Sequence, residues 1–274
     1  MGAPAKPANY GGGTFEYPGL TKRTMKISRS QILPDLPRAD RRVPLQTEAA
    51  KLKHFLLSTH RNAAACDCDL CTELDRQFIL KERMANQRGR IENFIKECFA
   101  SAYGARVCSF MPRLFKLTTL RGELVAAFGI RTAQAGQLFL ETYLDEPIER
   151  AIENKTGVKP QRGQIVEVGN LAAIYPGAVR WMIIALTMRL YDEGYEWVVF
   201  TGTTALRNAF HKLGLRPVVI GPARQDRLDA DERARWGTYY DTQPMVMAGN
   251  IRYGFQAMSH LKLAKSAKGK GKSV

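Results

Sequence analysis

The fold is decided by residues 164–215, which read QIVEVGNLAAIYPGAVRWMIIALTMRLYDEGYEWVVFTGTTALRNAFHKLGL. A short β-branched run at 165–168 predicts a strand, and a second apolar strand is expected at 197–201. Residues 178–192 between them are apolar on nearly every face, which is typical of a helix buried against a sheet. Two apolar strands around a crossover helix form a βαβ unit, so we expect the two strands to be parallel.

The turn that precedes this helix is the expected chemical centre. Residues 175–177 are turn residues, and the first backbone N–H groups of the following helix lack partners within the helix. The helix dipole is positive at this end, so the turn can bind an anion. Arg180 in the first turn is either a second donor to a phosphate or carboxylate, or an ordinary solvated or salt-bridged side chain.

The formal net charge of +15 over 274 residues lies mainly at the two ends of the chain. Residues 1–60 hold ten Lys or Arg against four acids, and residues 261–274 hold five Lys and no acid. We predict a mostly irregular basic extension at 1–60, one folded domain at 61–255 and a disordered Lys-rich tail at 256–274. The basic ends leave peripheral membrane contact open, whereas nucleic-acid recognition is not favoured, because no aromatic residues alternate with the basic ones.

Composition favours a cytoplasmic protein. No apolar run reaches about 18 residues, the length of a transmembrane helix, and the N-terminus lacks the apolar core of a signal peptide. Five Cys, an odd number, fit a reducing compartment. Cys66, Cys68 and Cys71, with His54 and His60 upstream, offer ligands to a soft metal. The paired spacing of a structural zinc site is absent, so we favour a reduced loop and expect no metal.

The remaining pattern predicts a mixed α/β single domain. A last helix should begin after Thr203 or Thr204 and end at Gly214. The other expected elements are helices at 70–102, with a break at Gly89, and at 147–154; strands or strand-like runs at 107–117, 124–131, 138–141, 218–220 and 245–247; and a polar loop at 221–236.

Several ordered blocks resemble the bacterial thermostable hemolysin family. The blocks are residues 138–141, 143–145, 147–149, 167–172, 197–203, 206–208, 213–214, 236–237 and 239–240. The resemblance covers about residues 90–254 and leaves out the basic ends and the three-Cys loop. That family in turn resembles GNAT acyltransferases, and among them acyl-homoserine-lactone synthases. The resemblance therefore implies a GNAT-like fold and transfer of a fatty acyl group from a thioester to a small amine or amino-acid-like acceptor.

Two motifs of those synthases are partly kept. Gly129 and Arg131 match a strand that ends in Gly-x-Arg, and Glu167 matches the acid of a Glu-x-x-Arg motif in which Asn170 replaces the Arg. The Gly-rich pyrophosphate loop of ordinary acetyltransferases is reduced to Gly177. The donor is therefore left open between acyl-CoA and an acyl carrier protein, and a basic surface would suit such an acidic carrier.

Acyl transfer to an amine needs a base for the amine proton and donors for the oxyanion. Glu167 is the first candidate base, because an acid inside an apolar strand has a raised pKa if it is buried. A buried salt bridge with Arg131 is the alternative role for Glu167. Glu141 is the second candidate acid, and Tyr240 or Tyr239 could protonate the leaving thiolate.

The binding candidates follow from the same placement. For the acceptor they are Arg131, Asn170 and Tyr239, although Asn170 could instead hold a strand bulge. For the acyl donor they are Gly177, Arg180, Thr201 and Asn208, although Asn208 could instead cap or pack near its helix. The alternative function is a membrane-active hemolysin that acts directly on lipid bilayers. The sequence favours the enzyme, because it has no amphipathic pore segment and its βαβ unit carries acids and an anion-binding turn.

Overall fold

The computed structural model describes residue 74, residues 77–82 and residues 87–259, so the predictions for 1–60 and for the three-Cys loop lie outside the described residues. The strands are β1 (Phe78–Glu82), β2 (Arg113–Thr119), β3 (Leu124–Thr132), β4 (Ile165–Ala173), β5 (Trp197–Gly202), β6 (Val218–Pro222) and β7 (Met245–Asn250). The α-helices are α3 (Arg88–Tyr103), α4 (Ile148–Thr156), α5 (Pro176–Asp192), α6 (Thr204–Lys212), α7 (Ala230–Arg235) and α8 (Ile251–Ser259). The short 3-10 helices are η3 (Ala133–Ala135), η4 (Phe139–Tyr143), η5 (Arg162–Gln164), η6 (Gln225–Arg227) and η7 (Tyr239–Thr242).

The described strands form one mixed sheet in the order β1-β2-β3-β4-β5-β7-β6. β4 and β5 are parallel, and every other neighbouring pair is antiparallel. The parallel ladder runs from Ile165 beside Trp197 to Val168 beside Phe200 and stops there, although β4 continues to Ala173. The predicted parallel βαβ unit and the mixed α/β class are therefore confirmed.

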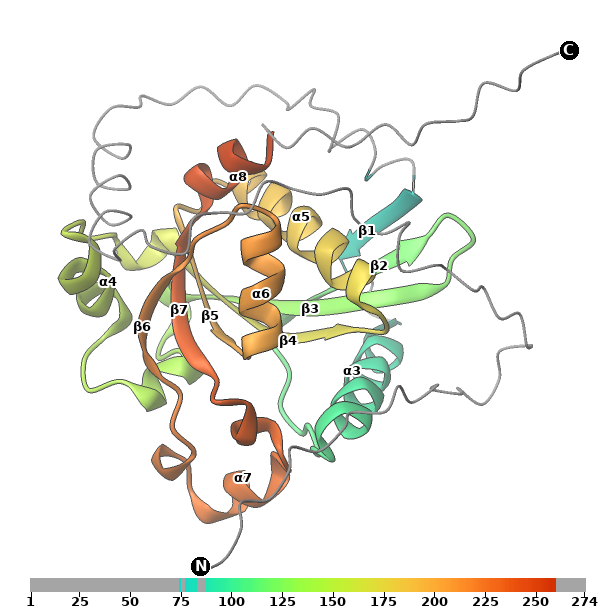
Figure 1. Cartoon of the computed structure of the whole chain (residues 1–274), viewed down its shortest axis with the longest axis horizontal. Coiled ribbons are helices and arrows are strands. Elements are labelled where there is room, and N and C mark those ends of the chain that lie inside the picture. Colours follow the sequence, from blue (N-terminus) through green and yellow to red (C-terminus); the bar gives the residue numbers. More distant parts are fainter. Residues whose placement is uncertain (1–73, 75–76, 83–86, 260–274) are drawn as a thin grey trace, which may run out of the picture. The chain divides into compact units, whose positions relative to one another are not determined.

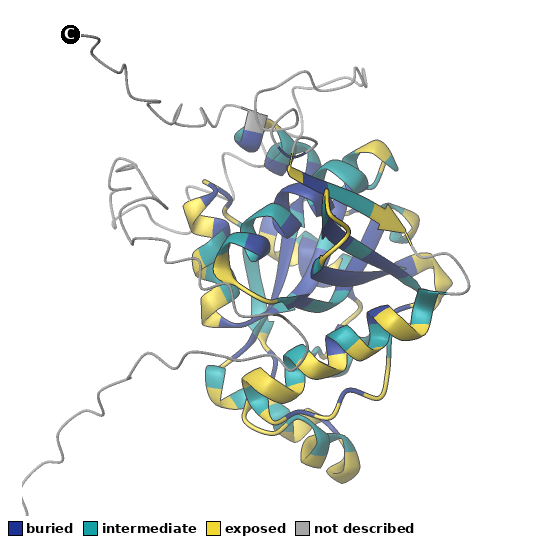
Figure 2. Ribbon diagram, turned by 90° about the vertical axis from the view of Figure 1, so that its right-hand side faces the viewer, coloured by how far each residue is buried: buried dark blue, intermediate teal, exposed yellow. Residues whose placement is uncertain are grey.

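One face of the sheet, called the α5 face below, is covered by apolar helices. Val166, Val168 and Phe200 pack there in one core with the buried side of α5. α5 is buried over much of its circumference because it contacts β3 and β4 as well as α6 and α8. Figure 1 shows α5 and α8 on one side of the strands and α3 on the other, and Figure 2 shows the buried strands between more exposed helices.

The opposite face, called the η4 face below, carries two further core clusters. Ile165, Trp197 and Val199 pack there against residues of η4 and α4. Ile91 and Ile95 of α3 pack against β2, β3 and β4 on the same side, where Ala127 and Ala172 leave room for the helix. The two faces alternate along each strand, so successive residues of β4 and β5 project to opposite sides of the sheet.

The prediction of a helical pattern over 70–102 is confirmed for 88–102, which lie in α3, and is wrong for 78–82, which form a strand. Phe78 and Leu80 lie in β1, which pairs with β2 through Phe78 beside Thr119 and Leu80 beside Leu117. Pairing with a sheet edge has overridden the helical spacing of these side chains. Gly89 lies in the first turn of α3 and causes no break.

Three other boundaries differ from the prediction. β2 begins at Arg113, directly after Pro112, which interrupts the predicted run 107–117 and has no N–H to give to the ladder. β4 continues five residues beyond Val168, to Ala173. α8 extends to Ser259 and so includes residues that were assigned to the tail. By contrast, α6 begins as predicted, with the Thr203 hydroxyl accepting a hydrogen bond from Leu206 N.

Candidate functional site

Glu167 is the most buried acid of the η4 face, with 2% of its surface exposed. Its carboxylate accepts hydrogen bonds from Phe139 N at 3.1 Å and from Leu140 N at 2.9 Å. Burial raises the pKa of Glu167, and the two backbone donors and the charge of Arg131 oppose that rise. Arg131 is the cross-strand neighbour of Glu167 on β3. The carboxyl group is therefore positioned by η4 and biased toward taking up a proton.

Glu141 lies in the same 3-10 turn but is held differently. Its carboxylate accepts from Leu138 N at 2.8 Å, from Ile148 N at 2.9 Å and from two guanidinium nitrogens of Arg162, each at 2.8 Å. Burial favours the neutral acid, but the hydrogen bonds from Arg162, Ile148 N and Leu138 N hold the pKa of Glu141 below its ordinary value. We therefore revise its predicted catalytic role: Glu141 positions η4 and α4 and stays ionised.

The predicted strand at 138–141 is consequently wrong. Glu141 closes the chain on itself by accepting from Leu138 N three residues earlier, which favours a 3-10 turn over an extended strand. This turn also places the N–H groups of Phe139 and Leu140 against Glu167. The shape of η4 thus sets the environment of the candidate base.

Tyr240 meets Tyr143 of η4 through their hydroxyl groups, which share a hydrogen bond of 2.5 Å. Burial raises the pKa of Tyr240 to about 12, and burial raises the pKa of Tyr143 further. Tyr239 is buried beside Tyr240, with ring centroids 5.2 Å apart, and packs edge-on against Tyr103 of α3. All three predicted catalytic residues, Glu167, Glu141 and Tyr240, thus converge on η4.

The backbone of Gly237 holds this aromatic segment against α3. Gly237 has a φ of +50°, and a Cβ there would lie 2.1 Å from the carbonyl oxygen of Tyr103. The next residue, Thr238, donates its N–H to the same carbonyl oxygen at 2.9 Å. Only glycine allows the two chains to approach this closely.

Asn170 has the bulge role that the sequence left open. It adopts a φ of +52° between Gly169 and Ala172, where the β3–β4 register shifts. Its Oδ1 accepts from Met111 N at 2.8 Å, and its Nδ2 donates to Ser109 O at 3.2 Å. With its amide oxygen and nitrogen both engaged by this segment, Asn170 serves the local structure, so the geometry does not support its predicted role in acceptor binding.

Gly129 of the Gly-x-Arg motif also has a packing reason. Cβ atoms at Gly129 and Gly169 would lie 2.4 Å and 2.5 Å from side-chain atoms of Met111. Met111 therefore covers both glycines across the β3–β4 ladder, and the Asn170 bulge pins its backbone. Neither glycine can gain a side chain without displacing this segment.

The predicted donor turn at the start of α5 lies on the α5 face of the sheet, opposite the η4 residues. Ala178 N and Val179 N both donate to Tyr175 O, at 3.0 and 3.3 Å, so these two donors are already occupied. Arg180 is half-buried, and its guanidinium carbon lies 5.9 Å from the ring centroid of Trp181. Burial lowers the pKa of Arg180, and it makes no ion pair with any described residue.

The remaining donor candidates are divided between the two faces. Thr201 follows Phe200 along β5, so its side chain projects to the η4 face. Asn208 is exposed on α6, the helix that packs beside α5. Gly177 lies in the first turn of α5, where a Cβ would meet the Tyr175 ring at 3.1 Å. The structure therefore does not gather the four donor candidates at one point.

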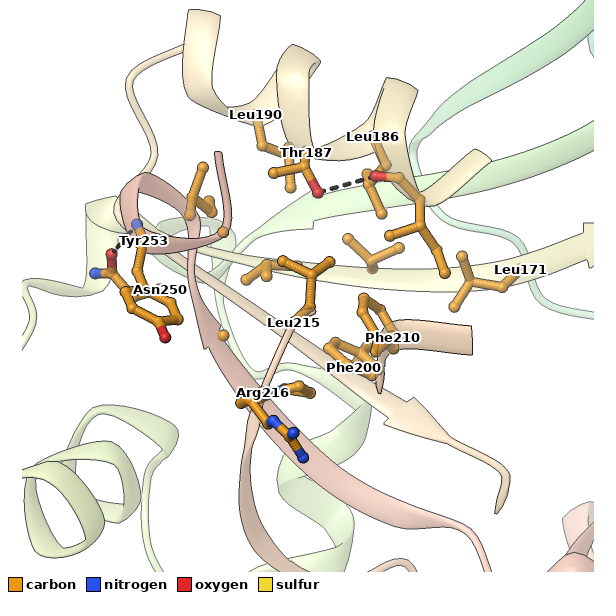
Figure 3. Close-up of a pocket in the computed structure, with 17 residues that line it drawn as sticks. Leu171, Leu186, Thr187, Leu190, Phe200, Phe210, Leu215, Arg216, Asn250 and Tyr253 are labelled. Atoms are coloured by element: carbon orange, nitrogen blue, oxygen red, sulfur yellow. Dashed lines mark hydrogen bonds between the residues drawn. The ribbon is translucent and has the colours of Figure 1, made fainter. Parts of the chain in front are cut away.

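An apolar cavity lies under α5 and α6 on the α5 face (Figure 3). Its lining includes Val168 and Leu171 of β4, Phe200 of β5 and Phe210 of α6. None of the ten predicted site residues lines it. Glu141, Glu167 and Arg180 do not share this cavity, because the two acids project to the opposite face of the sheet.

Sequence reasoning missed two residues of the η4 network. Arg162 was given no role, yet besides Glu141 it also donates to Glu149 Oε2 at 2.6 Å and to the carbonyls of Ala133 and Gly136. Tyr143 had no assigned role, although it pairs with Tyr240. Sequence spacing could not have identified Arg162, because its partners lie in three separate segments, around η3, in η4 and in α4. Within the described residues, no group of three or more His, Cys, Asp or Glu could hold a metal ion.

The sequence pattern of the thermostable hemolysin family matches residues 81–255, well over half of the chain. The chain belongs to the thermostable hemolysin family. A comparison with curated proteins gave no match. No helix in the described part of this family member is both long and apolar enough to cross a membrane.

Solved structures with a similar fold are distant in sequence. FeeM, an N-acyl amino acid synthase from uncultured soil microbes, has 13% identity and a TM-score of 0.47, covering 65% of this chain and 92% of FeeM. The AHL synthase LasI has 12% identity and a TM-score of 0.47, covering 68% and 95%. A GCN5-related N-acetyltransferase from Kribbella flavida has 12% identity and a TM-score of 0.40, covering 64% and 99%. In the present sheet, β7 lies between β5 and β6.

Proposed function

We propose that this family member is an N-acyltransferase that moves a fatty acyl group from a thioester to a small amine or amino-acid-like acceptor. The observation that carries the proposal is the environment of Glu167. A buried carboxyl group with a raised pKa lies on the central parallel pair, one residue before the β4–β5 ladder ends. Perturbed acids of this kind are concentrated at functional sites.

The acyl-thioester donor would lie along the last residues of β4, which extend beyond the end of the β4–β5 ladder. From Gly169 to Ala173, β4 has no ladder partner on its β5 side. Backbone N–H and C=O groups without strand partners can pair with the amides of an extended ligand, as in strand addition. Gly177 N and Arg180 would then receive a phosphate of the donor, since Ala178 N and Val179 N already donate to Tyr175 O. Both acyl-CoA and an acyl carrier protein present such a phosphate, and a cytoplasmic location would supply either donor.

The acceptor would approach from the η4 face. Its amine nitrogen would attack the thioester carbonyl carbon, Glu167 would take the proton from that nitrogen, and the C–S bond would break to release the thiolate. Tyr240 is a poor acid for this step, because its pKa of about 12 lies well above that of a thiol, about 8.5. We therefore assign the Tyr143–Tyr240 pair to hydrogen bonding with the oxyanion or the thiolate rather than to proton transfer.

Thiol release by the full-length protein tests this proposal. Decanoyl-CoA and a decanoyl acyl carrier protein would each be offered with a panel of amino acids and amines, and products would be identified by mass spectrometry. We expect release of one thiol per N-acyl amide formed, and only when an acceptor is present. Arg180→Ala should weaken donor binding, and an unchanged donor affinity would remove Arg180 from the site. Absence of thiol release with every pair would reject the enzyme.

A second candidate function, direct action on membranes, is favoured by the family name and by one surface feature. Leu120, Ile174 and Tyr175 are the large hydrophobic side chains that are exposed in the described part of the chain. They lie in two neighbouring turns, since Ile174 N donates to Val125 O at the start of β3. Lysis of liposomes by the protein without any thioester, lost in a Leu120→Ser/Tyr175→Ser double variant, would support this function.

A further inference from the structure

Arg162 uses every N–H donor of its guanidinium group, although the proposed reaction gives it no role. Its Nε donates to Ala133 O at 2.9 Å, and Nη2 donates to Gly136 O at 2.8 Å. The two Nη atoms also donate to the two oxygens of Glu141, each at 2.8 Å, and Nη1 donates to Glu149 Oε2 at 2.6 Å. A guanidinium has five N–H donors in a fixed plane, so this set of partners occupies all of them. Such complete use indicates a residue that fixes geometry.

Two of these partners flank the N–H groups that reach Glu167. Those donors are Phe139 N and Leu140 N, called the donor pair below, at 3.1 and 2.9 Å from the carboxylate. Gly136 lies three residues before the first of them, and Glu141 follows the second directly. The same guanidinium therefore holds the chain on both sides of the donor pair.

The segment that carries the donor pair has little regular structure of its own. Residues 133–147 join β3 to α4 and contain the 3-10 turns η3 and η4 but no strand or α-helix. Arg162, by contrast, begins η5, which leads directly into β4, the strand of Glu167. The sheet thus fixes the carboxyl group, and Arg162 ties the turn that supplies its donors to the same stretch of chain.

We propose that Arg162 is a positioning residue for acyl transfer, which keeps the donor pair against the carboxylate of Glu167 by holding the turn on both sides of it. This inference rests on the proposed function, in which Glu167 takes the proton of the acceptor amine. N–H donors stabilise the ionised carboxylate, which is the form that accepts a proton. Without Arg162 the turn would relax, the donor pair would withdraw, and Glu167 would keep its own proton to a higher pH.

The charges around Glu167 act in the same direction. Burial is the main cause of its raised pKa, the donor pair and Arg131 of β3 lower this pKa, and the charge of Glu141 raises it. On the β5 side its neighbour is Val199, which carries no charge. Loss of Arg162 would weaken the donor pair and leave the charge of Glu141 uncompensated, and both changes raise the pKa of Glu167.

Arg162→Lys and Arg162→Gln test this role through the acid limb, the fall of kcat/KM at low pH as Glu167 takes up a proton. The full-length protein would be assayed with the decanoyl thioester and acceptor that give thiol release. Lysine keeps the charge beside Glu141 but has three donors and no planar fork. We expect both variants to move the limb to higher pH by about one unit, the effect of losing a hydrogen bond to a charged group. Below the limb kcat should fall about 10-fold with KM unchanged, and above it kcat should recover.

The control is Arg150→Gln, which removes an exposed charge from α4, where Arg150 pairs with Glu153 at 3.9 Å. Its limb should stay at the wild-type pH. A wild-type limb in Arg162→Lys would show that only the charge matters and would overturn the proposal, as would an equal loss of rate at every pH. If Arg162→Gln does not fold, Arg162→Lys decides alone, because it keeps a cation beside Glu141.

The amide signals of the donor pair give a second readout that needs no substrate. In protein labelled with ¹⁵N-phenylalanine and ¹⁵N-leucine, the Phe139 and Leu140 signals should titrate with the Glu167 carboxyl group, and Glu167→Gln should abolish that titration. In Arg162→Lys its midpoint should move to higher pH. If the midpoint moves although no thioester and acceptor release thiol, the proposed function fails and the positioning role stands. If acyl transfer occurs and neither the midpoint nor the limb moves, the positioning role alone is wrong.

Discussion

The two faces of the sheet differ in how they use their buried residues. On the α5 face, aliphatic and aromatic side chains of α5, β4 and β5 form a continuous apolar core and enclose a cavity. On the η4 face, Glu167 and Glu141 are buried together with Arg162 and a group of tyrosines. Burying ions is costly unless every oxygen has a donor. Two N–H groups of η4 donate to Glu167, whereas Leu138 N, Ile148 N and Arg162 donate to Glu141. The comparison teaches that helix α5 provides packing, whereas a five-residue turn positions the buried acids.

Glycines on the two faces also differ in how tightly they are packed. The largest predicted effect on stability comes from Gly237 on the η4 side. Gly237→Ala on the η4 side should lower the free energy of unfolding by about 3 kcal/mol or more, because the new Cβ would overlap the Tyr103 carbonyl oxygen. Urea unfolding measures the loss. Gly122→Ala is the matched control, because its φ is +83° with nothing within 4 Å of the new Cβ. It should cost only about 1 kcal/mol, the price of the left-handed backbone. Equal losses would show that Gly237 is not in tight contact.

Removing the carboxylate of Glu167, the candidate base, should lower the rate of acyl transfer and leave the packing of the α5 face intact. Glu167→Gln should lower kcat/KM by about 10²-fold, since a general base contributes about that factor. In the wild type, kcat/KM should fall on the acid side at a pH above the ordinary Glu value, because burial raises the pKa of Glu167 and only its ionised form accepts a proton. The variant should lack this acid limb. A full rate, or an unchanged limb, would exclude Glu167 as the base.

Removing the guanidinium of Arg162 tests how much the ion pair with buried Glu141 contributes to stability. Arg162→Gln should destabilise the protein by about 2 kcal/mol at pH 7, because Glu141 would stay buried without its cation. The hydrogen bonds of Glu141 lower its pKa, so their stabilisation is present above the unfolded value and is lost as the pH falls through the folded one. Thermal unfolding measured from pH 7 to pH 3 should show that the difference in stability between the wild type and Arg162→Gln becomes smaller as the pH falls.

The control for that variant is Arg227→Gln, whose partner Asp145 is exposed. Exposed ion pairs contribute little, so its effect should stay within about 0.5 kcal/mol. A comparable loss in both variants would show that burial of Glu141 is unimportant.

The smallest effect is expected at a glycine of the α5 side. Gly254→Ala should stabilise the protein by about 0.5 kcal/mol, because Gly254 lies inside α8 and the new Cβ makes only ordinary contacts. Thermal unfolding at neutral pH would measure the gain. A loss of stability there would mean that α8 packs more tightly than the cavity implies.

The sequence predicted the α5 face well and the η4 face poorly, for a physical reason. The apolar run of α5 and the β-branched runs of β4 and β5 carry their own periodicity, so they define a buried helix between parallel strands. The apolar residues at 138–141 carried a similar signal for a strand, yet they form η4. Hydrogen bonds that Glu141 accepts from Leu138 N and Ile148 N decided that conformation, and side-chain bonding of this kind leaves no periodic trace.

By itself the sequence determined the mixed α/β class, the parallel βαβ unit and the presence of one acid inside a buried strand. Only the tertiary structure decided what that acid does, because the donors to Glu167 come from a turn 28 residues away and its cation from the neighbouring strand. It also decided that Asn170 holds a bulge and that Arg180 lies on α5, which covers the face of the sheet opposite the acids. Local spacing fixes which elements form, whereas contacts between distant segments fix the pKa values and partners on which a function depends.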